Sequence, residues 1–405
     1  MRRFGTYLPA AFAVLLATAG TAFAARHATH RHPAHRSAAH RSVPFGTFGT
    51  VLNYDWSHPI SPSDLGSQMG LMASSGVEAV RTDFAWAAIE TAPGVYNWSG
   101  TDAIVGAAAS HGLQVLPIVE FTPRWASSNP HGAYLYYAPS NPATYAQFLT
   151  ALIDRYGPHG SFWSVNPQLA RDPVRAWQIW DEPAGTKYDW RSAPWPSTYT
   201  RLLRTAYQAA HRADPGVVVV TGAVVALNGT NLTQWAETSA LYRAGFKRYF
   251  DVLGVNAFTG GHSAASSVSR SLEIVGRVRQ VMRAHGGART PIWVTEVTWT
   301  AAVGRIPSSE YAGFETTANG QAQRLAGYFG AVASRHPAGI QRAFWYNWSS
   351  SYKNVTNTPT FEFSGLTQWD GPGTSLHPLP VLSRYASVTA KYEGCRKTTN
   401  AGRCR

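Results

Sequence analysis

Two glutamates stand at the ends of short apolar segments that are rich in aromatic residues. Glu182 lies in Trp-Gln-Ile-Trp-Asp-Glu-Pro, and Glu296 closes Ile-Trp-Val-Thr-Glu. Cleavage of a glycosidic bond needs one carboxyl group to protonate the leaving oxygen and a second to stabilise or attack the sugar carbon. Either glutamate alone is read as easily as a loop carboxylate or a helix cap. Together they predict glycoside cleavage, provided that the fold brings them to one place.

Short apolar segments alternate with amphipathic ones along the chain, and these elements have to position the two acids. The candidate strands are 47–53, 79–83, 114–119, 176–180, 217–221, 252–256, 292–295 and 342–346. The candidate helices are 62–75, 101–110, 142–156, 197–213, 232–244, 268–285, 317–335 and 378–390. Eight strand–helix units predict an α/β fold, a (β/α)8 TIM barrel built as a single domain with enlarged loops.

In such a barrel the chemistry lies at the carboxyl ends of the strands, where both glutamates are placed by this assignment. An open doubly wound sheet is the alternative, but no Gly-x-Gly-x-x-Gly turn follows the first strand. The segments 157–173 and 347–375 are long connections, and we expect both to shape the site.

Four segments resemble the motifs of clan A glycoside hydrolases, most closely families 39 and 5. Residues 177–183 are similar to the clan's Trp-x-x-Trp-Asn-Glu-Pro signature. Residues 80–98, 111–126 and 293–296 resemble its second, third and seventh strands with their loops. The resemblance covers roughly residues 45–350.

This resemblance implies a retaining mechanism. Glu182 would be the general acid/base and Glu296 the nucleophile that forms a glycosyl-enzyme intermediate. Arg81 matches the clan's second-strand arginine, which implies a hydrogen bond that keeps the nucleophile ionised. The simpler interpretation of Arg81 is a structural ion pair with an acid such as Asp83.

The sequence departs from the clan's pattern at two positions. Asp181 replaces the asparagine that binds the sugar's 2-hydroxyl, and its charge is expected to raise the pKa of Glu182. The sixth strand has Asn256 and Phe258 where the clan often has a tyrosine that contacts the nucleophile. Either Asn256 replaces part of that polar contact, or Phe258 leaves the nucleophile less constrained.

Aromatic residues make up 13% of the chain, which has 15 tryptophans. Flat rings stack on the apolar faces of sugars, so tryptophans near strand ends fit a glycan cleft, although core packing explains most of them singly. The residues predicted to bind substrate, besides Asp181, Arg81 and Asn256, are Trp299, Trp345, Trp125 and Glu120.

The two ends of the chain differ from the rest. Residues 1–24 have the basic start, apolar run and Ala-x-Ala site of a signal peptide, with an uncleaved anchor as the alternative. Residues 25–43 are rich in His and Arg and are expected to form a disordered linker before the domain at 44–390. The basic tail 391–405 carries Cys395 and Cys404, which are expected to form a disulfide in an exported protein.

The formal net charge of +13 comes mostly from these ends, since the segment 44–390 is nearly balanced. A nucleic-acid partner is therefore not expected. The basic linker could contact an anionic cell envelope through its charge, or bind a metal unspecifically through its histidines. The mature chain is expected to lack a membrane span, and the motifs indicate no metal and no cofactor for catalysis.

These observations predict a secreted or cell-wall-associated hydrolase that cleaves a β-linked polysaccharide or oligosaccharide with retention. Two alternatives stay open at this point. One is a carbohydrate-binding pseudo-enzyme, which the changes at Asp181 and Phe258 would favour. The other is a transglycosylase that uses the same carboxylates.

Overall fold

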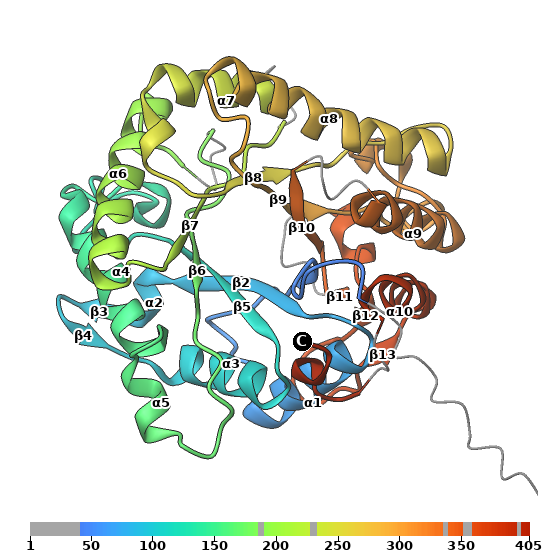
Figure 1. Ribbon diagram of the computed structural model, residues 1–405, viewed down its shortest axis with the longest axis horizontal. Coiled ribbons are helices and arrows are strands. Elements are labelled where there is room, and N and C mark those ends of the chain that lie inside the picture. The colour runs from blue at the N-terminus through green and yellow to red at the C-terminus, as the bar shows by residue number, and fades with distance from the viewer. Residues whose placement is uncertain (1–40, 185–189, 227–232, 335–338, 351–358, 395–397) are drawn as a thin grey trace, which may run out of the picture. The chain divides into compact units, whose positions relative to one another are not determined.

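Eight parallel strands form one sheet that curls into a barrel (Figure 1). The computed structural model describes residues 41–184, 190–226, 233–334, 339–350, 359–394 and 398–405. In spatial order the strands are β7 (Val218–Thr221), β6 (Ala176–Ile179), β5 (Gln114–Glu120), β2 (Ala79–Ala85), β1 (Phe48–Val51), β10 (Ile340–Trp345), β9 (Ile292–Val297) and β8 (Leu253–Asn256). Parallel bridges from Val220 to Val252 and from Val224 to Val255 join β7 to β8. The predicted (β/α)8 barrel is confirmed.

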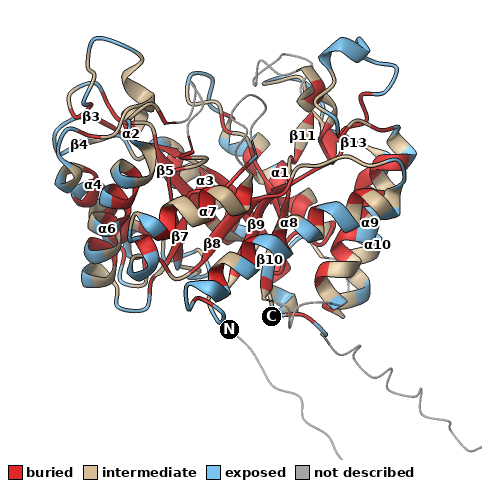
Figure 2. Cartoon of the chain, turned by 90° about the horizontal axis from the view of Figure 1, so that it is seen from above, coloured by how far each residue is buried: buried red, intermediate tan, exposed pale blue. Residues whose placement is uncertain are grey.

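Helices surround the barrel and bury the outer face of its sheet. They are α1 (Pro62–Ser74), α3 (Ser99–Ser110), α4 (Pro142–Tyr156), α6 (Trp195–Ala213), α7 (Gln234–Arg243), α8 (Ala264–Ala284), α9 (Ala318–Ser334) and α10 (Pro380–Glu393). Figure 2 shows buried residues along the strands and on the inner sides of the helices, with exposed residues on the outer sides. A strand such as β7 is apolar along almost its whole length because both faces of the sheet are covered.

Local sequence signals fix where several helices begin. The side chains of Ser61 and Asn141 accept backbone N–H groups of the first turns of α1 and α4, and a proline follows each of them. Ser263 and Ser266 form a reciprocal capping box at the start of α8. These caps satisfy N–H groups that have no partner within a helix, so they anchor the helices that hold the strands in register.

Smaller elements lie between the main ones. They are α2 (Trp86–Ile89), the hairpin β3 (Glu90–Ala92) and β4 (Val95–Tyr96), α5 (Ser161–Val165), the small sheet β11 (Ser349–Ser350), β12 (Thr367–Gln368) and β13 (His377–Pro378), and the 3-10 turns Tyr134–Tyr136, Phe246–Arg248, Ser308–Glu310, Pro359–Phe363 and Ala401–Cys404. Except for α5 and the turns at Phe246–Arg248 and Ala401–Cys404, they follow the carboxyl ends of barrel strands. Most of these smaller elements therefore lie at the end of the barrel that carries Glu182 and Glu296.

The prediction that 157–173 shapes the site is wrong. This segment leads into the amino end of β6, so it lies at the opposite end of the barrel from Glu182. It contains α5, where the Trp163 indole donates to the carbonyl of Tyr156. The segment that follows β10 does lie at the carboxyl ends of the strands, as expected.

The folded part begins slightly earlier than the predicted boundary at residue 44. Arg41 pairs with Glu78, and Val43 is buried. The rest of the linker, the signal peptide and Cys395 lie outside the described residues, so the signal peptide and the Cys395–Cys404 disulfide stay predictions. Within the described ranges, no helix has both the length and the apolarity to cross a membrane.

Candidate active site

The end of β6 carries the acid/base candidate on an unusual backbone. Trp180 and Glu182 have positive φ angles of 65° and 40°, a region that non-glycine residues rarely adopt. The indole of Trp180 is buried against Trp190 in an edge-on contact, which holds this turn from one side. Strained residues of this kind gather at functional sites, where surrounding contacts keep them in place. The turn brings Asp181 and Glu182, both half-buried, to the end of the barrel.

Arg81 contacts three other side chains of the site. It lies on β2, is fully buried, and donates from Nη1 to Glu296 Oε1 at 2.6 Å. Its Nη2 lies 2.8 Å from Asp181 Oδ1, and its Nε donates to Gln178 Oε1 at 2.8 Å. The Nε2 of Gln178 in turn donates to Asp181 Oδ1 at 2.9 Å. The predicted contact between Arg81 and Glu296 is therefore present, and the ion pairs of Arg81 join it to Glu296 and Asp181 rather than to Asp83.

Negative charge accumulates around this one guanidinium. Burial raises the pKa of Glu296 to about 8; Arg81 opposes the rise and the charge of Asp181 adds to it. Burial likewise raises the pKa of Asp83 to about 6, again with Arg81 opposing and Asp181 adding. Glu120, predicted to contact substrate, hydrogen-bonds the side chain of Asp83. Glu296 and Asp83 therefore hold protons more tightly than exposed carboxyls do.

A second chain of hydrogen bonds reaches Glu182. Asn256 Nδ2 donates to Glu182 Oε1 at 2.7 Å, and Asn256 Oδ1 accepts from Thr295 Oγ1 at 2.8 Å. The Thr295 contact fixes the amide so that its N–H side faces Glu182. In the strand register Asn256 lies directly beside Glu296. Asn256 thus contacts the acid/base candidate rather than the nucleophile candidate.

A tyrosine does lie near Glu296, but it follows β10 instead of β8. Burial raises the pKa of the Tyr346 hydroxyl, and the charge of Glu296 adds to the rise. The ring of Tyr346 packs edge-on against Phe258, and its hydroxyl accepts a hydrogen bond from Asn53 Nδ2 at 3.4 Å. Phe258 therefore supports Tyr346 by packing, so the missing tyrosine of β8 does not leave Glu296 without an aromatic neighbour.

Two of the predicted substrate contacts are wrong. Trp299 and Trp345 are 0% exposed, and their indole N–H groups donate to the carbonyls of Thr259 and Ser364. Neither ring offers a face to a sugar, because the two pack against each other and against the helices around the barrel. Strand ends are also where side chains fill the top of the barrel core, and the sequence does not separate that role from stacking on a ligand.

Trp125 fits its predicted role better. Its side chain is half-buried after β5, its indole donates to the carbonyl of Glu90 at 3.2 Å, and its ring contacts Trp86 edge-on. The contacts fix the ring in one orientation while part of it stays accessible. Glu90 itself accepts the indole N–H of Trp86, which matches a structural role.

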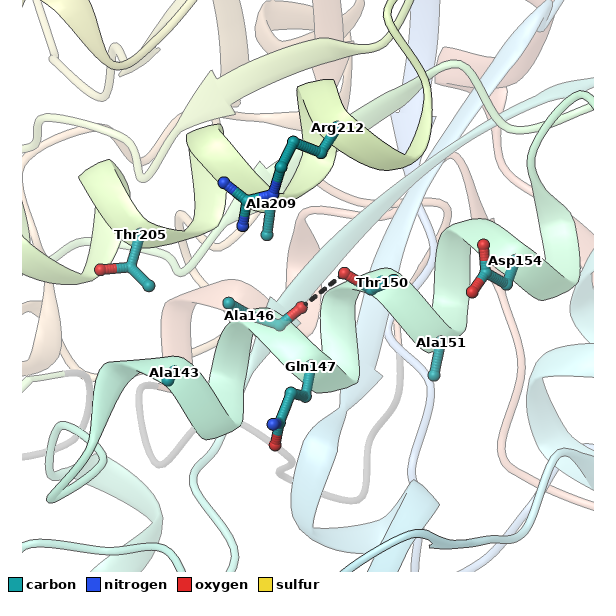
Figure 3. A pocket seen from close by; sticks show the side chains of 9 residues that line it. All are labelled: Ala143, Ala146, Gln147, Thr150, Ala151, Asp154, Thr205, Ala209 and Arg212. Atoms are coloured by element: carbon teal, nitrogen blue, oxygen red, sulfur yellow. Dashed lines mark hydrogen bonds between the residues drawn. The ribbon is translucent and has the colours of Figure 1, made fainter.

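Two hollows in the described part of the chain are lined by residues other than Glu182 and Glu296. One, of about 430 Å³, lies between α4 and α6 (Figure 3) and is lined by Ala143, Ala146, Gln147, Thr150, Ala151, Asp154, Thr205, Ala209 and Arg212. Its small side chains and the internal Thr150–Ala146 hydrogen bond are typical of helix packing. Within the described part of the chain, His, Cys, Asp and Glu side chains form no cluster suited to a metal ion.

Sequence reasoning missed Gln178 and Thr295 as parts of the site, and it indicated Tyr346 only as one of several aromatic residues near strand ends. Strand alternation could have found Gln178, because residues two apart on a strand share a face. Gln178 therefore shares the face of Ala176 inside the barrel, opposite Trp177 and Ile179. Nothing in the sequence indicates that Thr295 orients Asn256, since the contact joins neighbouring strands.

The whole described fold is similar to solved glycoside hydrolases. A family 39 enzyme from Bacteroides cellulosilyticus WH2 aligns with a TM-score of 0.59 and 19% identity, over 86% of this chain and 64% of its own, so this chain spans just under two thirds of that protein. A glucosidase from Croceicoccus marinus gives 0.60 and 16%, over 88% and 70%. A family 5 protein from Streptomyces cattleya, solved with Manβ1-4GlcNAc, gives 0.60 and 15%, over 85% and 80%.

No protein-family model matches the sequence, and no curated protein matches it either. The likeness therefore rests on structure, at identities below 20% for each of the three proteins. The chain has the (β/α)8-barrel fold that these glycoside hydrolases of families 39 and 5 share.

Proposed function

We propose that this chain is a secreted retaining O-glycosyl hydrolase that acts on a β-linked polysaccharide or oligosaccharide. The observation that carries the proposal is the pair of hydrogen-bond networks at the carboxyl ends of β6 and β9. One holds Glu296 through Arg81, and the other holds Glu182 through Asn256. A fixed cation beside one carboxylate and an amide donor beside the other give two acids with different environments, as an acid/base and a nucleophile need.

In this proposal Glu182 protonates the leaving oxygen while Glu296 attacks the anomeric carbon. The ion pair with Arg81 stabilises the charged form of Glu296 before the attack. Glu182, left as a carboxylate, then removes a proton from water, and the water oxygen displaces Glu296 from the sugar. Trp125 would contact a sugar at the rim, and Asp181 would contact the ring nearest the two glutamates.

Export of the chain is part of the proposal, supported by the signal-peptide pattern of residues 1–24. The His- and Arg-rich linker would then touch an anionic envelope through its positive charge. Secretion is tested by expressing the full chain and a version that lacks residues 2–24, and by measuring the protein outside the cells. Retention of both versions in the cytoplasm would contradict it.

The activity is tested on a panel of β-linked polysaccharides and oligosaccharides. Hydrolysis of at least one member by the wild-type protein, lost in Glu182→Gln and kept in the exposed control Glu273→Gln, supports the proposal. Product analysis in the presence of excess sugar separates hydrolysis from transfer to another sugar.

A binding protein without activity is the second candidate, and the charge of Asp181 favours it. That charge raises the pKa of Glu296, so a larger share of the nucleophile is protonated near neutral pH. Glycan binding without turnover at any pH between 5 and about 9 would select this candidate; the upper limit lies above the raised pKa of Glu296.

A further inference from the structure

The charge of Asp181 is not needed for the contacts that Asp181 makes. Both Arg81 Nη2 and Gln178 Nε2 approach the same atom, Oδ1. An asparagine in the same place would accept both with its amide oxygen. The structure of the site therefore explains a carbonyl-type oxygen at this position, but it does not explain a carboxylate.

The second oxygen of Asp181 is the atom that distinguishes it from asparagine. The Asp181 side chain is 16% exposed, and its Oδ2 has no hydrogen bond with a described residue. Asparagine would present an N–H donor here, whereas Asp181 presents a charged acceptor. A ligand group that meets this atom must therefore be a donor, and a cationic donor would be favoured most.

Among the residues that the structure describes, the cation paired with Asp181 is Arg81, and Asp181 shares it with a second acid. Arg81 also pairs with Glu296. The charges of Arg81 and Asp181 both act on the pKa of Asp83, which Arg81 lowers and Asp181 raises. Three carboxyls thus lie around one guanidinium. Burial is the main cause of the raised pKa values of Glu296 and Asp83, and the negative charge of Asp181 adds to both. A cationic ligand would lower the free energy of this site, and an anionic one would raise it.

We propose that the sugar bound beside Glu182 and Glu296 carries a free, protonated amino group, which donates to Asp181 Oδ2. The substrate is then a β-linked glycan that contains an unacetylated hexosamine. This inference rests on the proposed hydrolase function and names its substrate class. Acetylation of the amino group would remove its positive charge. A hydroxyl group in its place would donate only a neutral hydrogen bond to Oδ2.

The test compares matched substrates that differ at a single substituent. Aryl β-glycosides and β-1,4-linked hexamers are prepared with an amino, an acetamido or a hydroxyl group at carbon 2. We measure kcat/KM of the wild-type protein, of Asp181→Asn and of Asp154→Asn, a control that removes an equal charge from the exposed side of α4. A charge-assisted hydrogen bond of the usual strength predicts that wild type prefers the amino over the hydroxyl substrate by roughly 10- to 100-fold.

The ratio between substrates is an internal control for folding, because misfolded protein lowers both rates equally. We expect Asp181→Asn to abolish the amino preference or reverse it, and Asp154→Asn to keep it. A wild-type preference for the hydroxyl or acetamido substrate overturns the inference, as does an amino preference that survives in Asp181→Asn; either result leaves the hydrolase function standing. If no substrate is cleaved and Glu296 cannot be labelled by a glycosyl trap, the hydrolase function itself fails.

Discussion

At the scale of single residues, the site separates its two glutamates by giving them different neighbours. Arg81 is bonded to Glu296, and Asn256 is bonded to Glu182. A permanent cation stabilises a carboxylate, whereas a neutral amide donor tolerates either protonation state. This difference supports the proposed roles, with Glu296 as the nucleophile and Glu182 as the proton donor.

Replacement of Glu182 by glutamine should slow hydrolysis by roughly 10²- to 10⁴-fold on substrates with sugar leaving groups, because the leaving oxygen loses its proton donor. The loss in the glycosylation step should be much smaller for aryl glycosides whose leaving group needs no proton. Pre-steady-state rates on the two substrate types check this. Equal losses on both would indicate a structural role, and Glu273→Gln, which alters an exposed acid of α8, should leave both rates unchanged.

Asp181 should also influence the pH at which the proposed hydrolase becomes active. Glu296 must be ionised to attack, so kcat/KM falls as the pH decreases through its raised pKa of about 8. The charge of Asp181 contributes to that rise. Asp181→Asn should therefore move the acidic limb of the pH profile to lower pH, measured on a hydroxyl substrate. A limb that stays in place or moves upward would contradict this account of Glu296.

At the scale of elements, the alternation of strands and helices predicted the barrel well. All eight strands and the eight principal helices were assigned within a few residues of their observed bounds, because apolar runs and helix caps are local signals. The elements between Trp86 and Tyr96 and the small sheet after β10 were missed, since two- and three-residue strands carry almost no periodic pattern.

The site was predicted only where a strand end delivers the side chain. Glu182 and Glu296 follow from strand order, whereas Arg81, Asp181 and Asn256 were indicated by the resemblance to clan A. The structure joins Arg81 to Glu296 and Asp181, and it joins Asn256 to Glu182. Trp299 and Trp345 were assigned to the substrate wrongly, because a buried indole and a stacking indole look alike in a sequence. The segment 157–173 was also expected, wrongly, to shape the site. It comes before β6 in the sequence, so it leads into the amino end of that strand and not the carboxyl end.

The helix α7 contains an acid that should make the stability of the fold depend on pH. Burial raises the pKa of Glu237 to about 8, opposed by the hydrogen bond from the Val225 N–H. The unfolded chain has the ordinary value of about 4.3, so the folded state loses stability as the pH rises from there to about 8.

Glu237→Gln removes that titration. Its advantage in free energy of unfolding over wild type should be small at pH 4.5, grow through neutral pH, and level off above about 8. Urea denaturation of both proteins at several pH values measures the difference. A constant difference at all pH values would mean that Glu237 is ionised in the folded state throughout.

At the scale of the whole molecule, the two ends of the described chain meet at the amino ends of the strands. Ala401 is buried and its N–H donates to the carbonyl of His111, while Arg405 pairs with Asp172. Arg41 donates to the carbonyl of Cys404 and pairs with Glu78. The tail thus covers the end of the barrel that is opposite the glutamates.

Deletion of residues 398–405 should therefore lower the Tm and leave kcat/KM unchanged, because the lost contacts stabilise the barrel far from the acids. Thermal unfolding and an activity assay below the transition temperature check the two halves separately. A variant with unchanged Tm would show that the tail adds nothing to the barrel, and one with normal Tm but lower activity would place the tail near the site.

The proposed mechanism requires that Glu296 forms a covalent bond with the sugar. Its most direct test is incubation with a panel of activated 2-deoxy-2-fluoro glycosides, followed by mass spectrometry of the intact protein and of its peptides. The account predicts a gain of one fluoroglycosyl group on Glu296, abolished in Glu296→Gln and slowed by loss of Arg81. Cleavage of a natural glycan with inversion, or a label on any other residue, would contradict it.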